Sequence, residues 1–475
     1  MRSLTKNIAV CGGGLAGNMV ATRLVAGLGA DWKIFQLCDS MPPQHDIAYG
    51  NTSDPDSYNF LLDLGLNEPT LFLKSATSFS FGTHFSNWLN RSWMQCHHTP
   101  FQTLRGIPFR HFVARSNTSL EPLLISARAA IAGRFAHPPK DPAIILSRAE
   151  YGYQFDVREW AALLEQKVLA SRVIRKSSPI RSVTTDGDTL TGLKLENGED
   201  LEVDLVIDAA GTGRDVIGAA GGRFRSHRTV RINGSITREA ETGPPLRDVC
   251  SQLNGWTSTA HLQKARSVIQ VEAADSGGEQ AGDCIDIGLL DRAWVGNCIA
   301  IGHAASVIEP LTPAPVMMLR RDIDRLLELI PVSSDMTIER REFNRRFHED
   351  YEHIGLFHSA LMDCDDRPDT PYWQAAASGN SDDKLRRKID QFENRGKLAS
   401  YDLEPFNDED WTILHLGMGR RPRIYDRQVD RVPRAESESA LTEVRQSIQQ
   451  LVSKMPPHGA YIDRLKQFLS RQDNV

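Results

Sequence analysis

A short apolar run that ends in spaced glycines opens this chain and constrains its fold more than any other feature. Residues 8–11 are followed by Gly12, Gly14 and Gly17 at G-x-G-x-x-G spacing, and an Ala/Val/Leu-rich stretch continues to Leu28 at helical periodicity. In such a strand–turn–helix unit the first glycine permits the tight turn, the second lets a pyrophosphate approach the backbone, and the third allows close helix–strand packing. The helix N-terminus adds free N–H groups and partial positive charge.

A second strand is predicted over residues 32–38 and ends at Asp39, an acid that can accept both hydroxyls of an adenosine ribose. Asp39 lies 27 residues after Gly12, slightly beyond the usual spacing of about 20. The alternative is a glycine turn in a doubly wound sheet that binds no nucleotide. The order of strand, glycines, helix, strand and acid favours a dinucleotide site.

Composition restricts the class of protein. The chain has 475 residues, of which 40% are hydrophobic and 24% charged, as in ordinary soluble proteins of two or three domains. A net charge of −6 argues against nucleic-acid binding, and we expect neither a secretory signal nor a membrane span, because no long apolar run occurs. The seven cysteines are scattered and contain no C-x-x-C pair. We therefore expect a cytoplasmic protein with reduced thiols and no metal site.

Several stretches have the periodicity of regular structure. Residues 75–88 alternate aromatic and small polar side chains as a strand does, and 157–170 carries apolar residues at helical spacing. Three short strands are predicted over 180–183, 189–195 and 200–207, with turns between them.

The last of these strands leads into Asp208-Ala209-Ala210-Gly211, and a later strand over 297–305 precedes a loop and a helix over 316–329. A meander that re-enters a sheet in this way is the layout of a flavoprotein's FAD domain. After Ile338 the chain is predicted to be mainly helical and charged.

We therefore predict an α/β fold with a doubly wound, Rossmann-like FAD-binding domain of the GR2 flavoprotein type, a substrate lobe and a mainly helical C-terminal region. The predicted segments are 1–95, 151–221 and 291–337 for the FAD-binding domain, 96–150 and 222–290 for the substrate lobe, and 338–475 for the helical region.

The chain resembles the flavin-dependent tryptophan halogenases from end to end. Besides the glycine turn, the matching segments are Ala48-Tyr49-Gly50, Phe85-Ser86-Asn87-Trp88, His98-Thr99-Pro100-Phe101, Tyr153-Gln154-Phe155-Asp156, 204–211, 294–302, Glu309-Pro310-Leu311, Trp411, Gly417-Met418-Gly419, Pro422 and Tyr425. The resemblance implies a two-component enzyme that receives FADH2 from a separate flavin reductase and forms a flavin C4a-hydroperoxide with O2. In the halogenases chloride attacks this peroxide, and the resulting oxidant reaches a lysine beside an aromatic substrate. A homodimer is an open option, because the family often forms dimers.

The cofactor and substrate contacts follow from the glycine turn and from the resemblance. The predicted FAD contacts are Gly12, Gly14, Leu15, Ala16, Gly17, Asp39, Gly50, Asp208, Gly302, His303, Thr312 and Ala314. His303 replaces the Asn or Asp often found there in the family, so it contacts FAD or only caps the following turn. The predicted aromatic substrate contacts are Phe101, Trp256 and Trp411, with plain core packing as the alternative for each.

Three departures from the family fall on its chemistry. The position of the family's catalytic lysine, counted back from the F-x-N-W segment, holds Ser80, whose hydroxyl cannot form a chloramine. The W-x-W-x-I-P signature keeps only Trp256 and ends at His261. After Glu309-Pro310-Leu311 the family's halide loop, usually E/T-S-T-G, is replaced by Thr312-Pro313-Ala314-Pro315, where two prolines remove two N–H donors.

A flavin enzyme that uses the oxidant directly needs a base to take the substrate's proton. The candidates are His98, which lies in the family's H-x-P-F segment, then His97 and His261. Loop or surface histidines without a chemical role are the alternative. The leading hypothesis is an FAD-dependent monooxygenase or oxidase of the halogenase-like class, acting on an aromatic, indole- or tryptophan-type substrate in secondary metabolism. The alternatives are a genuine halogenase with relocated catalytic groups and a non-catalytic flavin-binding scaffold.

Overall fold

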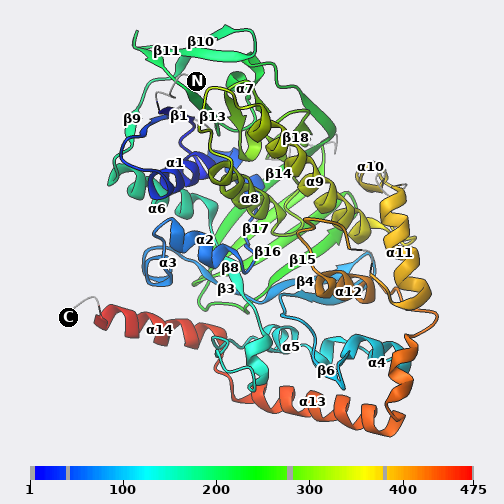
Figure 1. Ribbon diagram of the computed structural model, residues 1–475. Coiled ribbons are helices and arrows are strands. Elements are labelled where there is room, and N and C mark those ends of the chain that lie inside the picture. The colour runs from blue at the N-terminus through cyan, green and yellow to red at the C-terminus, as the bar shows by residue number, and fades with distance from the viewer. Residues whose placement is uncertain (1–5, 39–42, 275–281, 378–381, 399, 473–475) are drawn as a thin grey trace.

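A computed structural model describes residues 6–38, 43–274, 282–377, 382–398 and 400–472. The predicted contact of Asp39 lies outside the described residues. The nucleotide-type sheet and its helices lie at the top of the molecule in Figure 1, a large antiparallel sheet crosses the middle, and helices of the second half flank and underlie it.

The first layer is a six-stranded sheet with the order β19-β20-β13-β1-β2-β9. Its strands are β1 (Asn7–Cys11), β2 (Lys33–Leu37), β9 (Ile174–Lys176), β13 (Leu205–Asp208), β19 (Trp294–Val295) and β20 (Cys298–Ala300). β1 pairs in parallel with both β2 and β13. Helix α1 (Leu15–Gly27) packs against α6 (Val157–Leu169) and α8 (Ala314–Glu328), and this arrangement confirms the predicted doubly wound α/β fold.

The predicted three-strand meander needs one correction. β10 (Ile180–Asp186), β11 (Thr189–Leu195) and β12 (Asp200–Glu202) form a separate antiparallel sheet, while the remainder of the third predicted strand is β13 of the six-stranded sheet. The break falls at Val203-Asp204, where the Asp204 carboxylate accepts a hydrogen bond from the N–H of Asn7 at 2.8 Å. One apolar run is therefore divided between two sheets.

Two other predicted strands are interrupted at glycines with positive φ. The stretch 75–88 divides into β3 (Ser78–Ser80) and β4 (Gly82–Trp88), because Gly82 has φ +138°. The predicted strand 297–305 is extended only over β20; Gly302, with φ +65°, begins the 3-10 turn η4 (Gly302–Ala304) instead. A positive φ is a conformation that glycine adopts without steric cost.

The second layer is an eight-stranded sheet with the order β21-β18-β14-β17-β16-β15-β4-β5. Its strands are β4, β5 (Arg91–Cys96), β14 (Phe224–Arg238), β15 (Arg247–Gln252), β16 (Gly255–Leu262), β17 (Ala265–Ala273), β18 (Asp283–Leu290) and β21 (Ser306–Val307). β4 is parallel to β15, whereas the other pairs are antiparallel. Residues 82–96, which the prediction assigned largely to the FAD-binding segment 1–95, thus pair with strands of the predicted substrate lobe.

Helices make up most of the chain after β21, as predicted. They are α8, α9 (Thr337–Met362), α10 (Pro371–Ala377), α11 (Asp383–Arg395), α12 (Asp408–Gly417), η6 (Arg427–Arg431), α13 (Arg434–Lys454) and α14 (His458–Gln472). The shorter early elements are η1 (Pro43–Tyr49), α2 (Ser57–Asp63), α3 (Glu68–Lys74), β6 (Thr103–Leu104), β7 (Ile107–Pro108), α4 (Phe109–Ser116), η2 (Glu121–Leu123), α5 (Ile125–Ile131), η3 (Ile145–Arg148), β8 (Gly152–Gln154) and α7 (Asp215–Ala219). α14 returns to pack on α3, near the N-terminal half of the chain.

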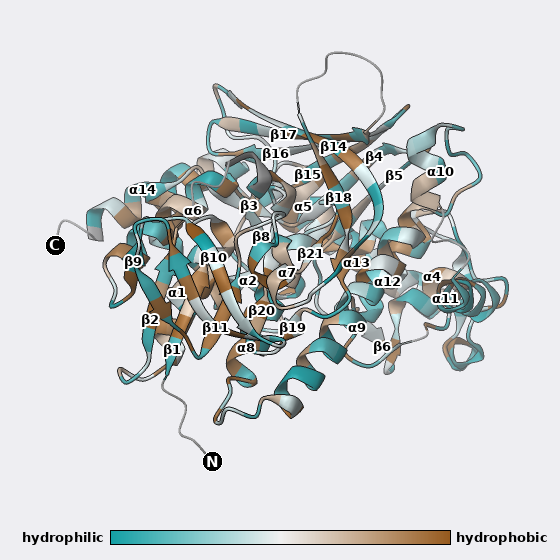
Figure 2. Cartoon of the chain, turned by 90° about the horizontal axis from the view of Figure 1, so that it is seen from above, coloured by the Kyte–Doolittle hydropathy of each residue, from teal (hydrophilic) through white to brown (hydrophobic). Residues whose placement is uncertain are grey.

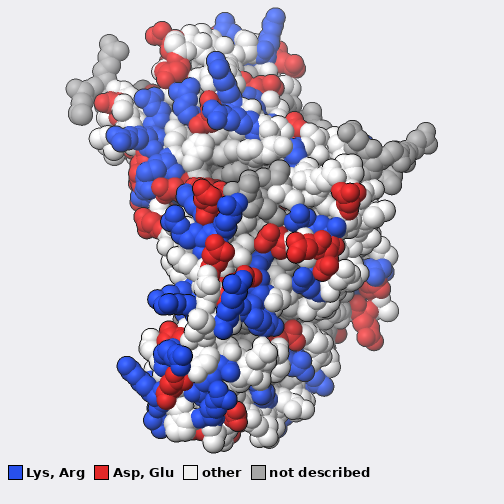
Figure 3. Space-filling view, turned by 90° about the vertical axis from the view of Figure 1, so that its right-hand side faces the viewer, with Lys and Arg blue, Asp and Glu red and all other residues white. Residues whose placement is uncertain are grey.

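Hydropathy follows this layering. Figure 2 shows hydrophobic residues concentrated in the strands of the six-stranded sheet, whereas α11 is largely hydrophilic. On the face shown in Figure 3, basic and acidic side chains are interspersed. Among the described residues, no helix is both long and apolar enough to cross a membrane.

Candidate functional site

The glycine turn joins β1 to α1 in the predicted manner. Gly12 has φ +126°, and a Cβ added there would lie 2.4 Å from the carbonyl oxygen of Ala209 on the neighbouring strand's exit. A Cβ at Gly17 would lie 2.3 Å from the Gly12 carbonyl oxygen. Gly12 is therefore required by close packing against the neighbouring strand, and Gly17 by close packing of α1 on the turn.

Gly14 faces a carboxylate instead of backbone. The Asp46 side chain, from η1, accepts a hydrogen bond from the N–H of Leu15 at 2.9 Å, and a Cβ at Gly14 would lie 2.9 Å from the same Oδ2 atom. The N-terminus of α1 thus already holds an anionic oxygen beside a residue that leaves room for it. This donor set fits one phosphate of a dinucleotide, for which the Asp46 carboxylate stands in.

A row of contacts leads from the turn toward the loop before α8. The Tyr49 ring stacks on His303 with centroids 3.8 Å apart, and the N–H of His303 donates to the Tyr49 hydroxyl at 3.1 Å. A Cβ at Gly302 would lie 3.0 Å from the Cβ of Ala16, and a Cβ at Gly50 would lie 3.1 Å from the Cβ of Pro310. These residues form a continuous path from the phosphate turn to residues 310–314. An extended cofactor such as FAD would need such a path.

Asp208, another predicted cofactor contact, is hydrogen-bonded to the backbone of its own chain. Its buried carboxylate accepts hydrogen bonds from the N–H groups of Ala210 and Ile217, at 3.2 and 2.9 Å. Burial raises the pKa of this carboxyl group. Asp208 therefore fixes the exit of β13 and the start of α7, and a direct contact with FAD stays a prediction.

A cavity of about 160 Å³ lies where the loop before α8 meets β4, β5 and the C-terminal helices. We call it the central cavity. Its apolar lining is Pro55, Phe85, Pro313, Ala314, Met317, Phe357, Pro405 and Phe406, and its polar lining is Asp54, Asp56, Thr83, Gln95, Cys96, His97, His98, Glu150, Thr312, Asn407 and Asp410. Thr312, in the predicted halide loop, also hydrogen-bonds to Nε2 of His358 at 2.8 Å. The predicted residues Thr312, Ala314 and His98 thus meet at one cavity.

His98 is presented to the cavity as a neutral imidazole. Its Nδ1 lies 2.5 Å from the carbonyl oxygen of Thr99, so Nδ1 carries the proton and Nε2 is the basic atom. Burial lowers the pKa of His98 to about 4, and burial lowers the pKa of His97 to about 4 as well. At neutral pH both rings are in the protonation state that a base requires.

His261 lies on the other face of the eight-stranded sheet. Its Nε2 is 3.3 Å from Asp248, whose second carboxylate oxygen is 2.9 Å from Nδ1 of His84. His84 alternates along β4 with Thr83 and Phe85, which line the central cavity, so its side chain points away from it. Burial acts to raise the pKa of Asp248, but the hydrogen bonds from His261 and His84 lower it to about 2. The structure thus separates the two predicted bases His98 and His261.

Ser80, at the position of the family's lysine, is fully buried on β3. Its hydroxyl donates to the carbonyl oxygen of Gly82 at 3.1 Å, and Ser80 is absent from the cavity lining. No lysine is among the described residues that line the cavity.

Trp256 hydrogen-bonds to Glu309, a carboxylate that the sequence analysis did not identify as a functional residue. Its indole N–H donates to Glu309 at 2.6 Å, and Glu309 also accepts from Tyr372 and Arg228. Glu309 is 2% exposed, so these three donors compensate a nearly buried charge. This cluster fixes the start of the loop that carries Thr312. The only sequence signal for the cluster was the Glu309-Pro310-Leu311 segment.

Phe101 and Trp411 are buried, but neither is among the residues that line the central cavity. The N–H of Phe101 donates to Glu409 at 3.2 Å, and the Trp411 ring packs against Phe357 at 5.1 Å. The aromatic residues that line the cavity are Phe85, Phe357 and Phe406 instead. Phe85 stands in the F-x-N-W segment, but no periodicity singled out Phe357 in α9 or Phe406 in the loop before α12.

Together, a mainly parallel nucleotide-type sheet with a glycine turn and a separate, mainly antiparallel sheet bordering a cavity are the architecture of the class of dinucleotide-binding α/β proteins. Comparison with known proteins is more specific. The sequence model of the tryptophan halogenase family matches residues 7–268 and 258–434. This chain therefore belongs to the tryptophan halogenase family, which confirms the resemblance and the flavin-dependent, halogenase-like enzyme class.

Individual relatives are distant but cover nearly the whole chain. Tryptophan 6-halogenase ThaL of Streptomyces albogriseolus is 22% identical, with 82% of each chain covered. Tryptophan 7-halogenase KtzQ of Kutzneria sp. (strain 744) is also 22% identical, over 97% of this chain and 98% of the relative. Among solved structures, the flavin-dependent halogenase BrvH from Brevundimonas sp. BAL3 is similar with a TM-score of 0.88 and 24% identity, covering 98% and 99% of the two chains.

Proposed function

We propose that this protein is an FAD-dependent oxygenase that inserts oxygen into an aromatic, indole-type substrate held in the central cavity. The observation that supports this most is the composition of the cavity lining. It combines three aromatic rings, two neutral histidines and the Thr312–Ala314 loop, and the residues of the described ranges that line it include no lysine.

The cofactor would be held along the row of contacts described above. The turn Gly12–Gly17 and the N–H of Leu15 would bind the pyrophosphate once Asp46 withdraws, and residues around Gly50, Gly302 and His303 would border the rest of the molecule. Reduced FAD with O2 supplies an electrophilic oxygen when bound, and a separate flavin reductase would provide the reduced form.

The chain's own residues would position the substrate and move its proton. Phe85, Phe357 and Phe406 offer flat apolar surfaces to an aromatic ring and exclude water. His98, whose Nε2 is basic, would accept the proton released when the ring regains aromaticity. His97, the neighbouring cavity residue, is the second candidate for this role.

The alternative is halogenation, the activity that the printed names of the relatives state. The departures at Ser80, Trp256–His261 and Thr312–Pro315 weigh against it, because the first removes the amine and the last removes two N–H donors. A scaffold that binds flavin without turnover is the remaining alternative.

The deciding experiment incubates the full-length protein with FAD, NADH, a flavin reductase, O2 and tryptophan or indole, at several bromide concentrations. Mass spectrometry of the products reads out the result. An oxygenated product whose yield is independent of bromide supports the proposal, and a brominated product that scales with bromide refutes it. Flavin binding without any product would favour the scaffold. A Gly14→Val variant serves as the control for flavin-independent chemistry.

A further inference from the structure

The electrostatics of the central cavity restrict its substrate further. We propose that the cavity selects an aromatic compound that carries a protonated amine and discriminates against one whose only charge is a carboxylate. This inference rests on the proposed function only for the location of the substrate, and the experiment below separates the two.

The cavity lining contains four carboxylates and neither lysine nor arginine among the described residues. Asp54 and Asp56 precede α2, Glu150 precedes β8, and Asp410 lies in the first turn of α12. Three separate parts of the chain thus each place acidic side chains on one small space. A buried carboxylate needs a cation or several hydrogen bonds to remain ionised. The question is therefore whether the protein itself or a bound ligand supplies the positive charge.

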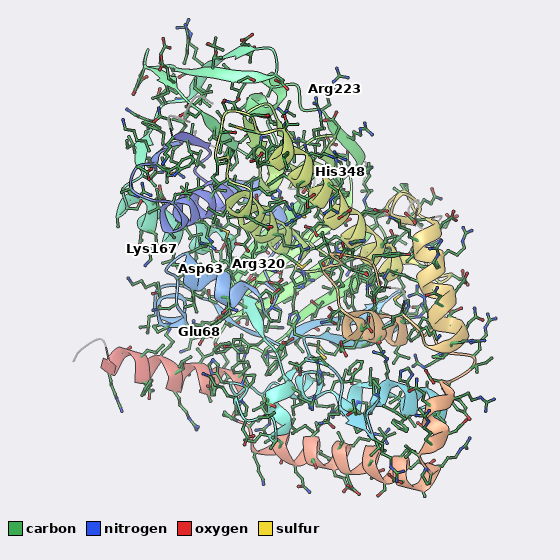
Figure 4. All side chains as sticks on the ribbon, in the orientation of Figure 1. Asp63, Glu68, Lys167, Arg223, Arg320 and His348 are labelled. Atoms are coloured by element: carbon green, nitrogen blue, oxygen red, sulfur yellow. The ribbon has the colours of Figure 1, made fainter. Side chains whose placement is uncertain are left out.

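The protein compensates this charge only in part. Arg320 of α8, which lies beside α2 in Figure 4, contacts Asp54 at 3.0 Å and Asp56 at 3.2 Å. Arg247, behind the loop, donates both of its terminal nitrogens to the carbonyl groups of Pro310 and Leu311. Arg320 therefore forms ion pairs with two of the four carboxylates, whereas Arg247 donates its hydrogen bonds to backbone carbonyl groups.

Glu150 and Asp410 have no ion pair in the described part of the chain. Asp410 accepts one hydrogen bond, from the N–H of Asn407 at 3.0 Å. Burial, reinforced by Asp56 and Glu409, raises the pKa of Glu150, and burial raises the pKa of Asp410 to about 7. Both groups would gain from a nearby positive charge, which would draw them into the ionised form.

A second, independent feature also indicates a ligand. Nε2 of His97, a residue of the cavity lining, is buried and has no hydrogen-bond partner in the described structure. Buried polar atoms are almost always paired in folded proteins, so a ligand group or water is expected to meet this atom. The stacked rings of Phe357 and Phe406, 3.8 Å apart, offer π-faces that attract cations as well.

The test compares three ligands with the same indole ring: tryptamine (a cation), tryptophan (a zwitterion) and indole-3-propionate (an anion). Isothermal titration of the full-length protein at pH 7.5 measures the affinities. We expect tryptamine to bind at least tenfold more tightly than indole-3-propionate, with tryptophan between them. Glu150→Gln, which keeps size and shape, should reduce this ratio severalfold. Glu196→Gln, on the exposed hairpin between β11 and β12, should leave the ratio unchanged.

The outcomes separate the two proposals. Indole-3-propionate that binds as tightly as tryptamine, or no binding of any of the three, overturns the charge selection. A ratio that is unchanged in both Glu150→Gln and Asp410→Asn, with thermal unfolding like the wild type, overturns it too. Tight binding of tryptamine without any oxygenated product contradicts the proposed function and supports the charge selection.

Discussion

The carboxylate of Asp46 hydrogen-bonds to the N–H of Leu15, at the point of the glycine turn where a dinucleotide's phosphate would bind. Flavin binding then requires this side chain to leave. Under the proposed function, the Asp46 carboxylate would therefore compete with the cofactor for the N-terminus of α1.

We therefore expect Asp46→Asn to bind FAD more tightly than the wild type. The interaction of an anion with a helix N-terminus contributes roughly 0.3–1 kcal/mol, which corresponds to an affinity gain of about two- to fivefold. Quenching of flavin fluorescence measures the change, with Asp200→Asn on the exposed hairpin as the control. Weaker binding by Asp46→Asn would show that the carboxylate assists the cofactor.

Gly14 and Gly17 should fail in different ways when replaced. Gly17→Ala places a Cβ 2.3 Å from a backbone oxygen, so we expect a loss of folding stability of about 1–3 kcal/mol. At Gly14 the obstacle is the end of the Asp46 side chain, which can move. Gly14→Val should therefore keep its thermal midpoint near the wild type while losing flavin binding. Wild-type FAD affinity in Gly14→Val would contradict the phosphate assignment.

The cluster around Glu309 should be sensitive to loss of its charge. Glu309→Leu leaves the largely buried Arg228 without its counter-ion, and breaking such a pair costs about 3–5 kcal/mol. Glu309→Gln keeps an acceptor for Trp256 and Tyr372, so its loss should be smaller. Urea unfolding followed by tryptophan fluorescence gives both values. Equal effects of the two variants would mean that charge is unimportant here.

His98 and His261 provide a matched pair for the proposed proton transfer. We expect His98→Gln to lower kcat for oxygenated product by a factor of about 100 or more, the usual contribution of a positioned base. His261→Gln should leave kcat near the wild-type value, because its ring lies on the other face of the sheet. Steady-state product analysis tests this, with FAD affinity measured in both variants. A larger loss in His261→Gln would reverse the assignment.

Burial of His98 should make folding stability depend on pH. Its pKa is about 4 in the folded protein and about 6.5 in the unfolded chain. Between these values the unfolded state binds more protons, so stability falls as the pH falls from about 6.5 to 4. Wild type should lose stability relative to His98→Asn over this window, in chemical denaturation at pH 6.5, 5.5 and 4.5. A constant difference would indicate an exposed imidazole.

Local signals predicted the nucleotide-type sheet well. The glycine spacing and the helical run at 157–170 reflect local backbone demands, and the structure has β1, α1, β2 and α6 where they were expected. Residues 200–207 were interpreted as one strand, because periodicity carries no information about which sheet each half joins. The hydrogen bond between Asp204 and Asn7, nearly two hundred residues apart, decides that division.

The cavity was predictable only in part. His98 and Thr312 stood in recognisable segments, whereas Glu150, Phe357 and Phe406 reach the cavity through long-range packing that no short window of sequence contains. The substitution at His261 was visible, but the face of the sheet on which it lies depends on the register of β4, β15 and β16.

The crossing of the chain between its two sheets has a consequence for biosynthesis. β1 and β2 emerge early from the ribosome, but the next strands of their sheet, β13 and β20, begin only at Leu205 and Cys298. In the other sheet, β4 cannot pair with β15 until the chain has reached Arg247. Neither sheet can be completed until about two thirds of the polypeptide has been translated. Until then the nascent chain exposes unpaired strand edges, which are prone to aggregation. The yield of folded protein in a heterologous host should therefore rise with added chaperones and with a lower growth temperature.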